Sequence, residues 1–143
     1  MNFSIALEPR FSMREQQSLR ILVVDDNAAH REVAVALISS RGLRVDVAAN
    51  GSEAVDAFQR NSYSLILMDL EMPVMDGYEA ARQIRLLEKG GPRVPIIAWS
   101  LWAADLDEGE YLRAGMDGYL GKPTSPADFR GVIERWLPRE PLE

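Results

Sequence analysis

Short apolar runs alternate along this 143-residue chain with longer segments of helical period. Three runs are apolar almost throughout: ILVV at 21–24, LILM at 65–68 and VPIIAW at 94–99. A strand that is apolar on both faces is typical of a parallel sheet covered by helices on both sides. Strands that alternate with helices over short loops form right-handed βαβ units. The sequence therefore predicts an α/β fold with a doubly wound parallel sheet.

The expected elements follow from the apolar periodicity and from residues typical of helix ends. Strands are predicted at 20–24, 44–48, 65–69, 94–99 and 117–121. Helices are predicted at 27–40, from 51 to about 61, from 77 to the glycines at 90–91, at 105–114 and at 125–137, the fourth of them shortened by Gly109. One domain is expected at 19–138, between a flexible N-terminal arm or linker at 1–18 and a C-terminal tail at 139–143.

Composition excludes several classes of function. The chain has no cysteine, which excludes disulfides and thiolate metal sites. The net charge of −6 makes direct binding to nucleic acid unfavourable and suits a cation or a basic protein face. No apolar run approaches the roughly 20 residues that a membrane span needs, and the N-terminus does not resemble a secretory signal. A cytoplasmic protein without a membrane or nucleic-acid partner is expected.

Carboxylates stand where two of the predicted strands end. Asp25 and Asp26 follow the first strand, and Asp69 ends the third. In a doubly wound sheet, ligands bind beyond the carboxyl ends of the strands. A single aspartate there is often a helix cap, but three that converge would repel one another unless a cation lay among them. Mg²⁺ is the expected ion, because it binds carboxylate oxygens and keeps several waters.

The last two strands deliver a hydroxyl and an amine to the same edge. Ser100 follows the fourth strand and Lys122 follows the fifth. Ser100 alone would be interpreted as a helix cap, and Lys122 alone as a solvated cation. Together with a carboxylate nucleophile and a metal, they suit phosphoryl transfer, in which catalysis is mostly positioning and charge neutralisation.

These motifs resemble those of response-regulator receiver domains of two-component signalling. The resemblance rests on ILVVDDN (21–27), ANGSEAV (49–55), LILMDLEMPVMDGYEAARQIR (65–85), VPIIAWS (94–100) and AGMDGYLGKP (114–123), of which the long central segment is the most specific. It implies a flavodoxin-like (βα)5 fold with the strand order 2-1-3-4-5. The ending PTSPADFRGVIERWL resembles the receivers of hybrid histidine kinases.

The resemblance also implies roles for the acidic residues. Asp69 would be the phospho-acceptor, taking a phosphoryl group from a histidine kinase or a histidine phosphotransfer protein. Asp26 would bind Mg²⁺ directly, Asp25 largely through water, and Glu71 through its backbone carbonyl. Such a domain is a signalling switch, and it is an enzyme only in promoting its own phosphorylation and dephosphorylation.

The basic and aromatic residues receive roles in the same way. Ser100 and Lys122 would hold the phosphoryl oxygens, and the Lys122–Pro123 peptide bond would be cis. Tyr119 would act with Ser100 as a switch that reshapes the face formed by 105–114, 117–121 and 125–137. That face would bind a downstream protein, and a homodimer through it is a further expectation. The alternative reading is that Tyr119 simply packs beneath the helix at 105–114.

The end of the fourth strand departs from the family pattern, in which a small aliphatic residue, threonine and alanine are usual; Ser100 keeps the hydroxyl, and Trp102 lies where family members vary. Leu101 stands where a small residue is usual, beside the expected phosphoryl site, and Trp102 follows it. Both are predicted to shape access, so that phosphorylation, dephosphorylation or both are slow. Trp102 is expected to be exposed, and Trp99 is expected in the core because strand residues alternate. His30, the only histidine, is expected on the first turn of a helix, facing solvent.

Two alternative functions remain open at this stage. A phosphorylation-independent receiver-like interaction module is supported by Leu101 alone, because every reactive residue is present. A haloacid-dehalogenase-type phosphatase also uses a strand that ends in Asp-X-acid. Pro73 and the upstream position of Asp25 and Asp26 contradict the order of motifs expected in such phosphatases.

Overall fold

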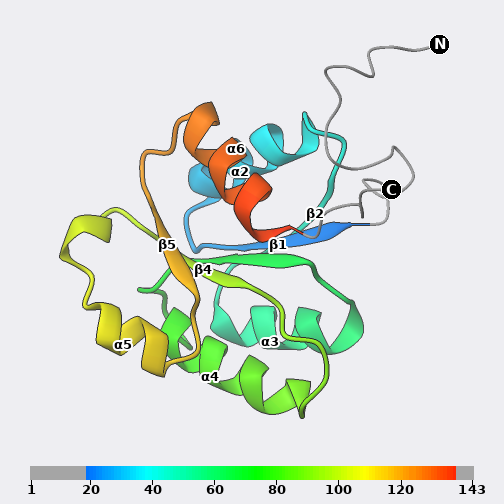
Figure 1. The fold of residues 1–143 in the computed structure, drawn as a ribbon, viewed down its shortest axis with the longest axis vertical. Coiled ribbons are helices and arrows are strands. Elements are labelled where there is room, and N and C mark those ends of the chain that lie inside the picture. Colours follow the sequence, from blue (N-terminus) through cyan, green and yellow to red (C-terminus); the bar gives the residue numbers. More distant parts are fainter. Residues whose placement is uncertain (1–18, 138–143) are drawn as a thin grey trace.

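One five-stranded sheet organises the computed structural model, which describes residues 19–137. All strands are parallel, in the order β2-β1-β3-β4-β5. Helices α2 and α6 cover one face, and α3, α4 and α5 lie on the other (Figure 1). The doubly wound fold and its strand order are therefore confirmed, whereas the predicted arm at 1–18 and tail at 139–143 lie outside the described residues.

The elements keep close to their predicted ranges. The strands are β1 (Arg20–Val24), β2 (Arg44–Ala48), β3 (Leu65–Met68), β4 (Ile96–Ser100) and β5 (Gly118–Gly121). The helices are α2 (Ala28–Ser39), α3 (Gly51–Arg60), α4 (Gly77–Glu88), α5 (Glu108–Arg113) and α6 (Pro126–Trp136), with a short 3-10 turn, η2, at Ala103–Asp105. None of the helices within 19–137 has the length and apolar character needed to cross a bilayer.

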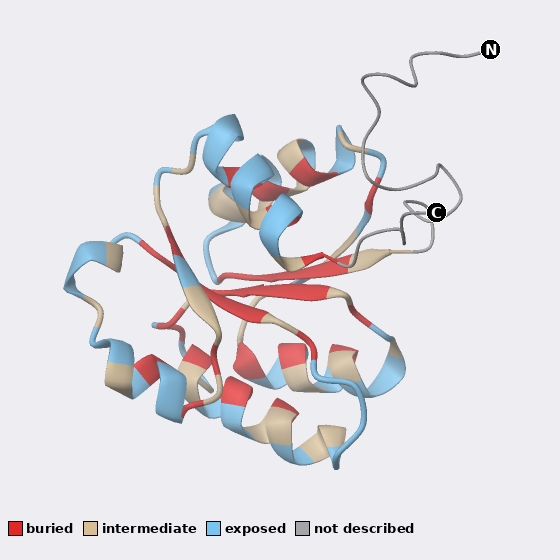
Figure 2. Cartoon of the chain, viewed as in Figure 1, coloured by how far each residue is buried: buried red, intermediate tan, exposed pale blue. Residues whose placement is uncertain are grey.

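Alternate residues of the central strands build two separate cores. Leu22 and Ile66 face α3 and α4, whereas Ile21 and Leu65 face α2 and α6. The strands are consequently buried on both sides, as Figure 2 shows for the centre of the sheet. Burial on both faces explains why these runs lack the polar alternation of a half-exposed strand. It also fixes the register that brings the strand ends to one edge.

Each α-helix begins with a side chain that caps its first turn. The capping residues are Asn27, Asn50, Asp76, Asp107 and Ser125, and each accepts a hydrogen bond from the backbone N–H three residues later. These caps satisfy donors that the helix itself leaves unpaired. Because Asn27 and Asp76 end the loops that follow β1 and β3, the caps also fix where α2 and α4 begin relative to the carboxyl ends of these strands.

The fourth strand and the fourth helix differ from prediction. Strand β4 begins at Ile96, because the carbonyl and the N–H of Val94 bind Arg85 and Glu88 of α4, and Pro95 has no N–H. The helix predicted at 105–114 is divided: η2 ends at Asp105, and α5 begins only after Leu106 has turned the backbone to an extended conformation.

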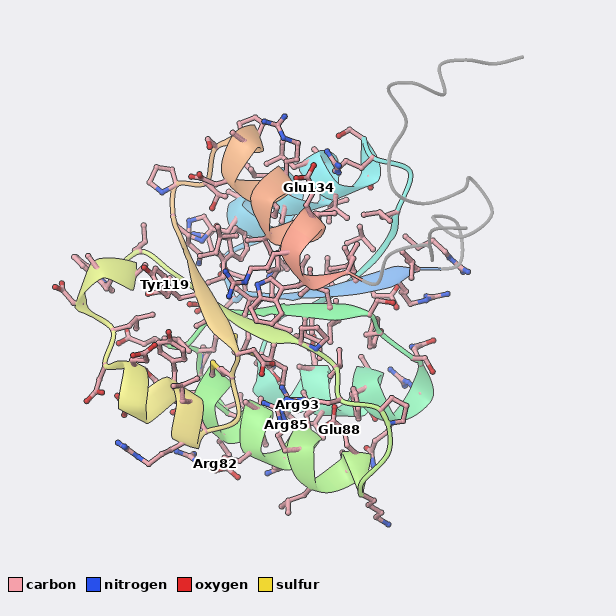
Figure 3. The ribbon with its side chains drawn as sticks, viewed as in Figure 1. Arg82, Arg85, Glu88, Arg93, Tyr119 and Glu134 are labelled. Atoms are coloured by element: carbon pink, nitrogen blue, oxygen red, sulfur yellow. The ribbon has the colours of Figure 1, made fainter. Side chains whose placement is uncertain are left out.

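A largely buried arginine joins α4 to the segments that lead into β4 and β5 (Figure 3). Arg85 donates to the backbone oxygens of Val94 at 2.7 Å and Gly115 at 2.8 Å. It also pairs with Asp117 at 2.8 Å and with Glu88 at 2.9 Å. With its side chain 13% exposed, Arg85 holds α4 against the segments that lead into β4 and β5.

Candidate functional site

Three carboxylates meet at the carboxyl ends of β1 and β3. Oxygens of Asp25, Asp26 and Asp69 lie within 4.8 Å of one another. The register sets this convergence, because Val24 pairs with Met68 and the N–H of Asp69 donates to the Val24 carbonyl at 2.9 Å. The prediction that neighbouring strands bring these acids together therefore agrees with the geometry.

Asp25 is the most buried of the three acids, with no exposed surface. One of its oxygens accepts from the backbone N–H of Asn27 at 2.9 Å, and the other accepts from the Lys122 ammonium. Its backbone carbonyl accepts from Arg31 at 2.7 Å. A buried carboxylate is tolerated only when its lone pairs are satisfied in this way. Asp26, by contrast, is exposed at the mouth of the site.

Burial raises the pKa of Asp69 to about 6. The Lys122 charge opposes this shift of the pKa, and the charges of Asp25 and Asp26 add to it. The carboxylate of Asp69 is therefore poorly stabilised where it stands. Such a group gains from a cation or from covalent neutralisation of its charge, which suits both a metal ligand and a nucleophile.

Lys122 projects into the same site from the end of β5. Its side chain is 5% exposed, and its ammonium lies 3.8 Å from Asp69 Oδ1. The ammonium also lies 4.6 Å from the centre of the Trp99 ring. The Lys122–Pro123 peptide bond is cis, as the resemblance implied.

Ser100, Leu101 and Trp102 line the same site from the end of β4. Ser100 is buried, and its hydroxyl accepts from the backbone N–H of Trp102 at 3.0 Å. Leu101 and Trp102 are 55% and 63% exposed, so Trp102 is on the surface as predicted. Trp99 faces the core, 2% exposed, as its alternation with Ser100 predicted.

Tyr119 and Glu71 lie at the margins. Tyr119 is 56% exposed, and its ring meets Tyr111 of α5 edge to face at 6.3 Å, so it contacts α5 at the surface and is not buried beneath it as in the alternative reading (Figure 3). Glu71 lines the cleft with its side chain in solvent.

His30 belongs to the site, and the prediction that it faces solvent is wrong. Its Nδ1 lies 3.2 Å from Asp25 Oδ2 and 3.2 Å from Lys122 Nζ, and its side chain is 34% exposed. The sequence held one clue: His30 is three residues beyond the cap Asn27. That places it on the first turn of a helix that begins beside the acidic pair.

These residues enclose a cleft of about 250 Å³. Its cluster of carboxylate oxygens, from Asp25, Asp26 and Asp69, fits a hard divalent cation such as Mg²⁺. A larger hollow of about 730 Å³ lies elsewhere, beside Tyr63 and Trp136. Because the cleft combines a metal-binding acid cluster with a lysine and a hydroxyl, it can support transfer of a phosphoryl group to a carboxylate.

Comparison with protein families gives a match over most of the described chain. The response regulator receiver domain family matches residues 21–134. Among curated proteins, the sensor protein GacS of Pseudomonas syringae is 36% identical over 119 residues, which cover 82% of this chain and 13% of GacS. The chain thus spans a small part of this relative.

Solved structures give the same similarity. The receiver domain of the sensor histidine kinase PA1611 from Pseudomonas aeruginosa, with a magnesium ion in its active-site cleft, is 42% identical, with a TM-score of 0.74 over 82% of this chain and 96% of that one. A further match is the complex of the Saccharomyces cerevisiae phosphotransfer protein Ypd1 with the receiver domain of Ssk1, at 29% identity and a TM-score of 0.77, covering 84% of this chain and 89% of the matched chain.

Proposed function

Because the chain belongs to the response regulator receiver domain family, we propose that Asp69 is the residue of this receiver that accepts a phosphoryl group. The observation that carries the proposal is the convergence of Asp25, Asp26 and Lys122 on Asp69 at one sheet edge. In the reaction, an Asp69 oxygen forms a bond to phosphorus while the phosphorus–nitrogen bond of a phosphohistidine breaks. The electron pair of that bond leaves with the imidazole.

The other residues act by position and charge. Asp25, Asp26, Asp69 and the backbone carbonyl of Glu71 would hold Mg²⁺, which when bound neutralises the phosphoryl oxygens. The Lys122 ammonium, 3.8 Å from Asp69 Oδ1, would pair with an oxygen of a phosphoryl group on Asp69. The Ser100 hydroxyl, which now accepts from the N–H of Trp102, would turn to donate to another oxygen.

Partners follow from the similar proteins. Ypd1 is a histidine phosphotransfer protein bound to a receiver domain, and GacS is a sensor protein that contains a similar segment. We propose that a phosphohistidine on a kinase or a phosphotransfer protein is the donor. A downstream protein, or a second copy of this chain, would then bind the face formed by α5, β5 and α6. Tyr119 lies on this face, and it would turn inward when Ser100 moves toward the phosphoryl group.

A phosphorylation-independent interaction module is the second candidate. The observation that favours it is Leu101, which adds bulk beside the cleft. The intact set of acids, hydroxyl and lysine favours the phospho-accepting receiver. A phosphatase of the haloacid-dehalogenase type is disfavoured, since the acidic pair precedes the nucleophile strand.

The test is the gain of one phosphoryl group. The purified chain is incubated with Mg²⁺ and either acetyl phosphate or a phosphorylated histidine kinase, and its intact mass is followed over time. We expect one phosphoryl group on the wild type and none on Asp69→Asn or in excess chelator. Asp26→Asn should slow the gain roughly a hundredfold, the scale of loss when one charge-stabilising group is removed. No gain from either donor would favour the interaction module.

A further inference from the structure

The lysine of the cleft stands over the ring of a buried tryptophan. Trp99 lies in β4 and packs in the core formed with α2 and α6, with 2% of its surface exposed. The Lys122 ammonium lies over the face of its ring, 4.6 Å from the ring centre. A cation in this position is attracted by the negative face of the indole, and tryptophan gives the strongest contact of this kind among the aromatic residues. The lysine charge is therefore in contact with a neutral group as well as with acids.

The same indole donates a hydrogen bond on the far side of the lysine. Trp99 Nε1 donates to the Thr124 hydroxyl at 2.9 Å, and that hydroxyl donates to the Gly121 carbonyl at 2.6 Å. An indole N–H can only donate and a carbonyl oxygen can only accept, so the direction of both bonds is fixed. One ring thus binds the segment that runs from the residue before Lys122 to the second residue after it.

The orientation of the ring is set by its neighbours. Trp99 meets Phe129 of α6 and His30 of α2 edge to face, with ring centres 6.0 Å and 6.3 Å apart. The backbone N–H of Lys122 donates to the Ser100 carbonyl at 3.0 Å. Two successive residues of β4 therefore contact both the backbone and the charge of the lysine.

The contact with the ring differs in kind from the contact with an acid. The Lys122 ammonium also pairs with Asp25, but Asp25 is one of the three carboxylates of the cation cluster. Trp99 lies outside that cluster, so a cation bound there does not compete for the face of its ring. The ring contact is thus available to an ammonium that lies 3.8 Å from Asp69 Oδ1, whether or not the cation is bound.

We propose that Trp99 is a positioning residue for Lys122: the face of its ring holds the ammonium beside Asp69, and its N–H fixes the segment at 121–124 that carries the lysine. A phosphoryl group on Asp69 would then meet a charge that is already in place, which avoids the reorganisation of a long, free side chain. The inference deepens the proposed function, on which it rests for the use of Lys122.

The first test observes the lysine directly and needs no phosphodonor. The chain has two lysines, Lys122 and Lys89, and Lys89 is exposed at the end of α4. Protein labelled with ¹³C at the lysine ε-carbons should therefore give two ε-methylene signals, which Lys89→Arg assigns. Because an aromatic ring shifts protons above its face upfield, the Lys122 signal should lie upfield of the Lys89 signal. Trp99→Leu should move the Lys122 signal toward that of Lys89, and a signal that stayed in place would overturn the proposal.

A pair of variants at Thr124 tests the hydrogen bond without emptying the core. Thr124→Val keeps the shape of the side chain but removes the acceptor of the indole N–H, whereas Thr124→Ser keeps the hydroxyl. Thr124→Val should displace the Lys122 ε-methylene signal and slow phosphorylation of Asp69 by acetyl phosphate roughly threefold to tenfold. Thr124→Ser should match the wild type in both measurements. Equal behaviour of the two variants would contradict the proposed role of the indole N–H.

A rate measurement with a matched core control separates positioning from stability. Ile133→Ala also empties part of this core, in which Ile133 is 2% exposed, but it retains the indole ring and its N–H. Both Trp99→Leu and Ile133→Ala should unfold at lower urea concentrations than the wild type. With Mg²⁺ and acetyl phosphate, Trp99→Leu should be phosphorylated about tenfold more slowly, the scale of a desolvated cation–π contact. Ile133→Ala should keep the wild-type rate.

The outcomes distinguish this inference from the function on which it rests. An equal loss of rate in Trp99→Leu and Ile133→Ala would show that the tryptophan acts only on stability, and the proposal would be wrong. If the wild type gained no phosphoryl group while the Lys122 signal responded to Trp99→Leu as expected, the proposed function would fail and the positioning of the lysine would stand.

Discussion

Leu101 and Trp102 extend from the end of β4 into solvent, beside the cleft. Because more than half of each residue is exposed, shortening either one leaves no buried cavity. Any change in reactivity would then report on access to Asp69 and not on stability. A bulky side chain at position 101 narrows the approach of a small phosphodonor and of the water that hydrolyses the acyl phosphate.

We therefore expect Leu101→Ala and Trp102→Ala to raise the rate of phosphorylation by acetyl phosphate, the rate of hydrolysis, or both. A tenfold change would correspond to about 1.4 kcal/mol of barrier. Leu86→Ala, which shortens a leucine 75% exposed on α4, is the matched control. Intact-mass time courses give both rates. If neither rate moves in either variant, these side chains do not control access.

At the scale of elements, α4 approaches β3 so closely that only glycine fits at its first position. A Cβ on Gly77 would stand 2.2 Å from the backbone oxygen of Asp69 and 2.9 Å from Met68 Cγ. Backbone cannot yield as a flexible side chain can. The helix start would have to shift away from the strand end that carries the phospho-acceptor.

Gly77→Ala should accordingly lower the free energy of unfolding by about 1–3 kcal/mol, the usual cost of overpacking. It should also weaken Mg²⁺ binding, because Asp69 moves. Gly131→Ala makes the same change in α6, where a Cβ would meet nothing within 4 Å; it should be neutral or stabilise by about 0.5–1 kcal/mol. Urea titrations of both variants compare them. Equal effects would contradict the close approach.

Sequence patterns predicted the helices and strands well wherever a short stretch of the sequence determines the element by itself. Apolar runs located β1 and β3, and the Ser125-Pro126 start located α6. The start of β4 was misplaced because tertiary contacts, from Arg85 and Glu88 to the backbone of Val94, override its apolar pattern. The hydrophobic periodicity of a segment carries no information about its contacts with distant segments.

The candidate site shows the same limit. The positions of Asp25, Asp26, Asp69, Ser100 and Lys122 at the ends of predicted strands were enough to predict that these residues share one site. His30 was missed, because its role depends on how the first turn of α2 faces the end of β5, which no pattern within either segment specifies.

At the scale of the whole molecule, the site lowers the free energy of unfolding at neutral pH. The raised pKa of Asp69, about 6 against an ordinary 3.8, means that the folded state keeps a proton that the unfolded chain loses near pH 4. Between these two values the folded state binds more protons. The free energy of unfolding therefore falls as pH rises from about 4 to about 6, and it stays low above that range.

Asp69→Asn removes this penalty without changing the fold. In chelator at pH 8, the variant should be more stable than the wild type by about 1–3 kcal/mol, and the difference should shrink as pH falls below about 5. Asp56→Asn, on an exposed residue of α3, removes one charge far from the site and serves as the control. Mg²⁺ should stabilise the wild type more than Asp69→Asn, since it binds the folded state through the carboxylate that the variant lacks. Urea unfolding across this pH range measures all of these differences. If the wild type were the more stable protein at pH 8 in chelator, the folded protein would stabilise the Asp69 carboxylate without a cation, and the argument from its raised pKa would be wrong.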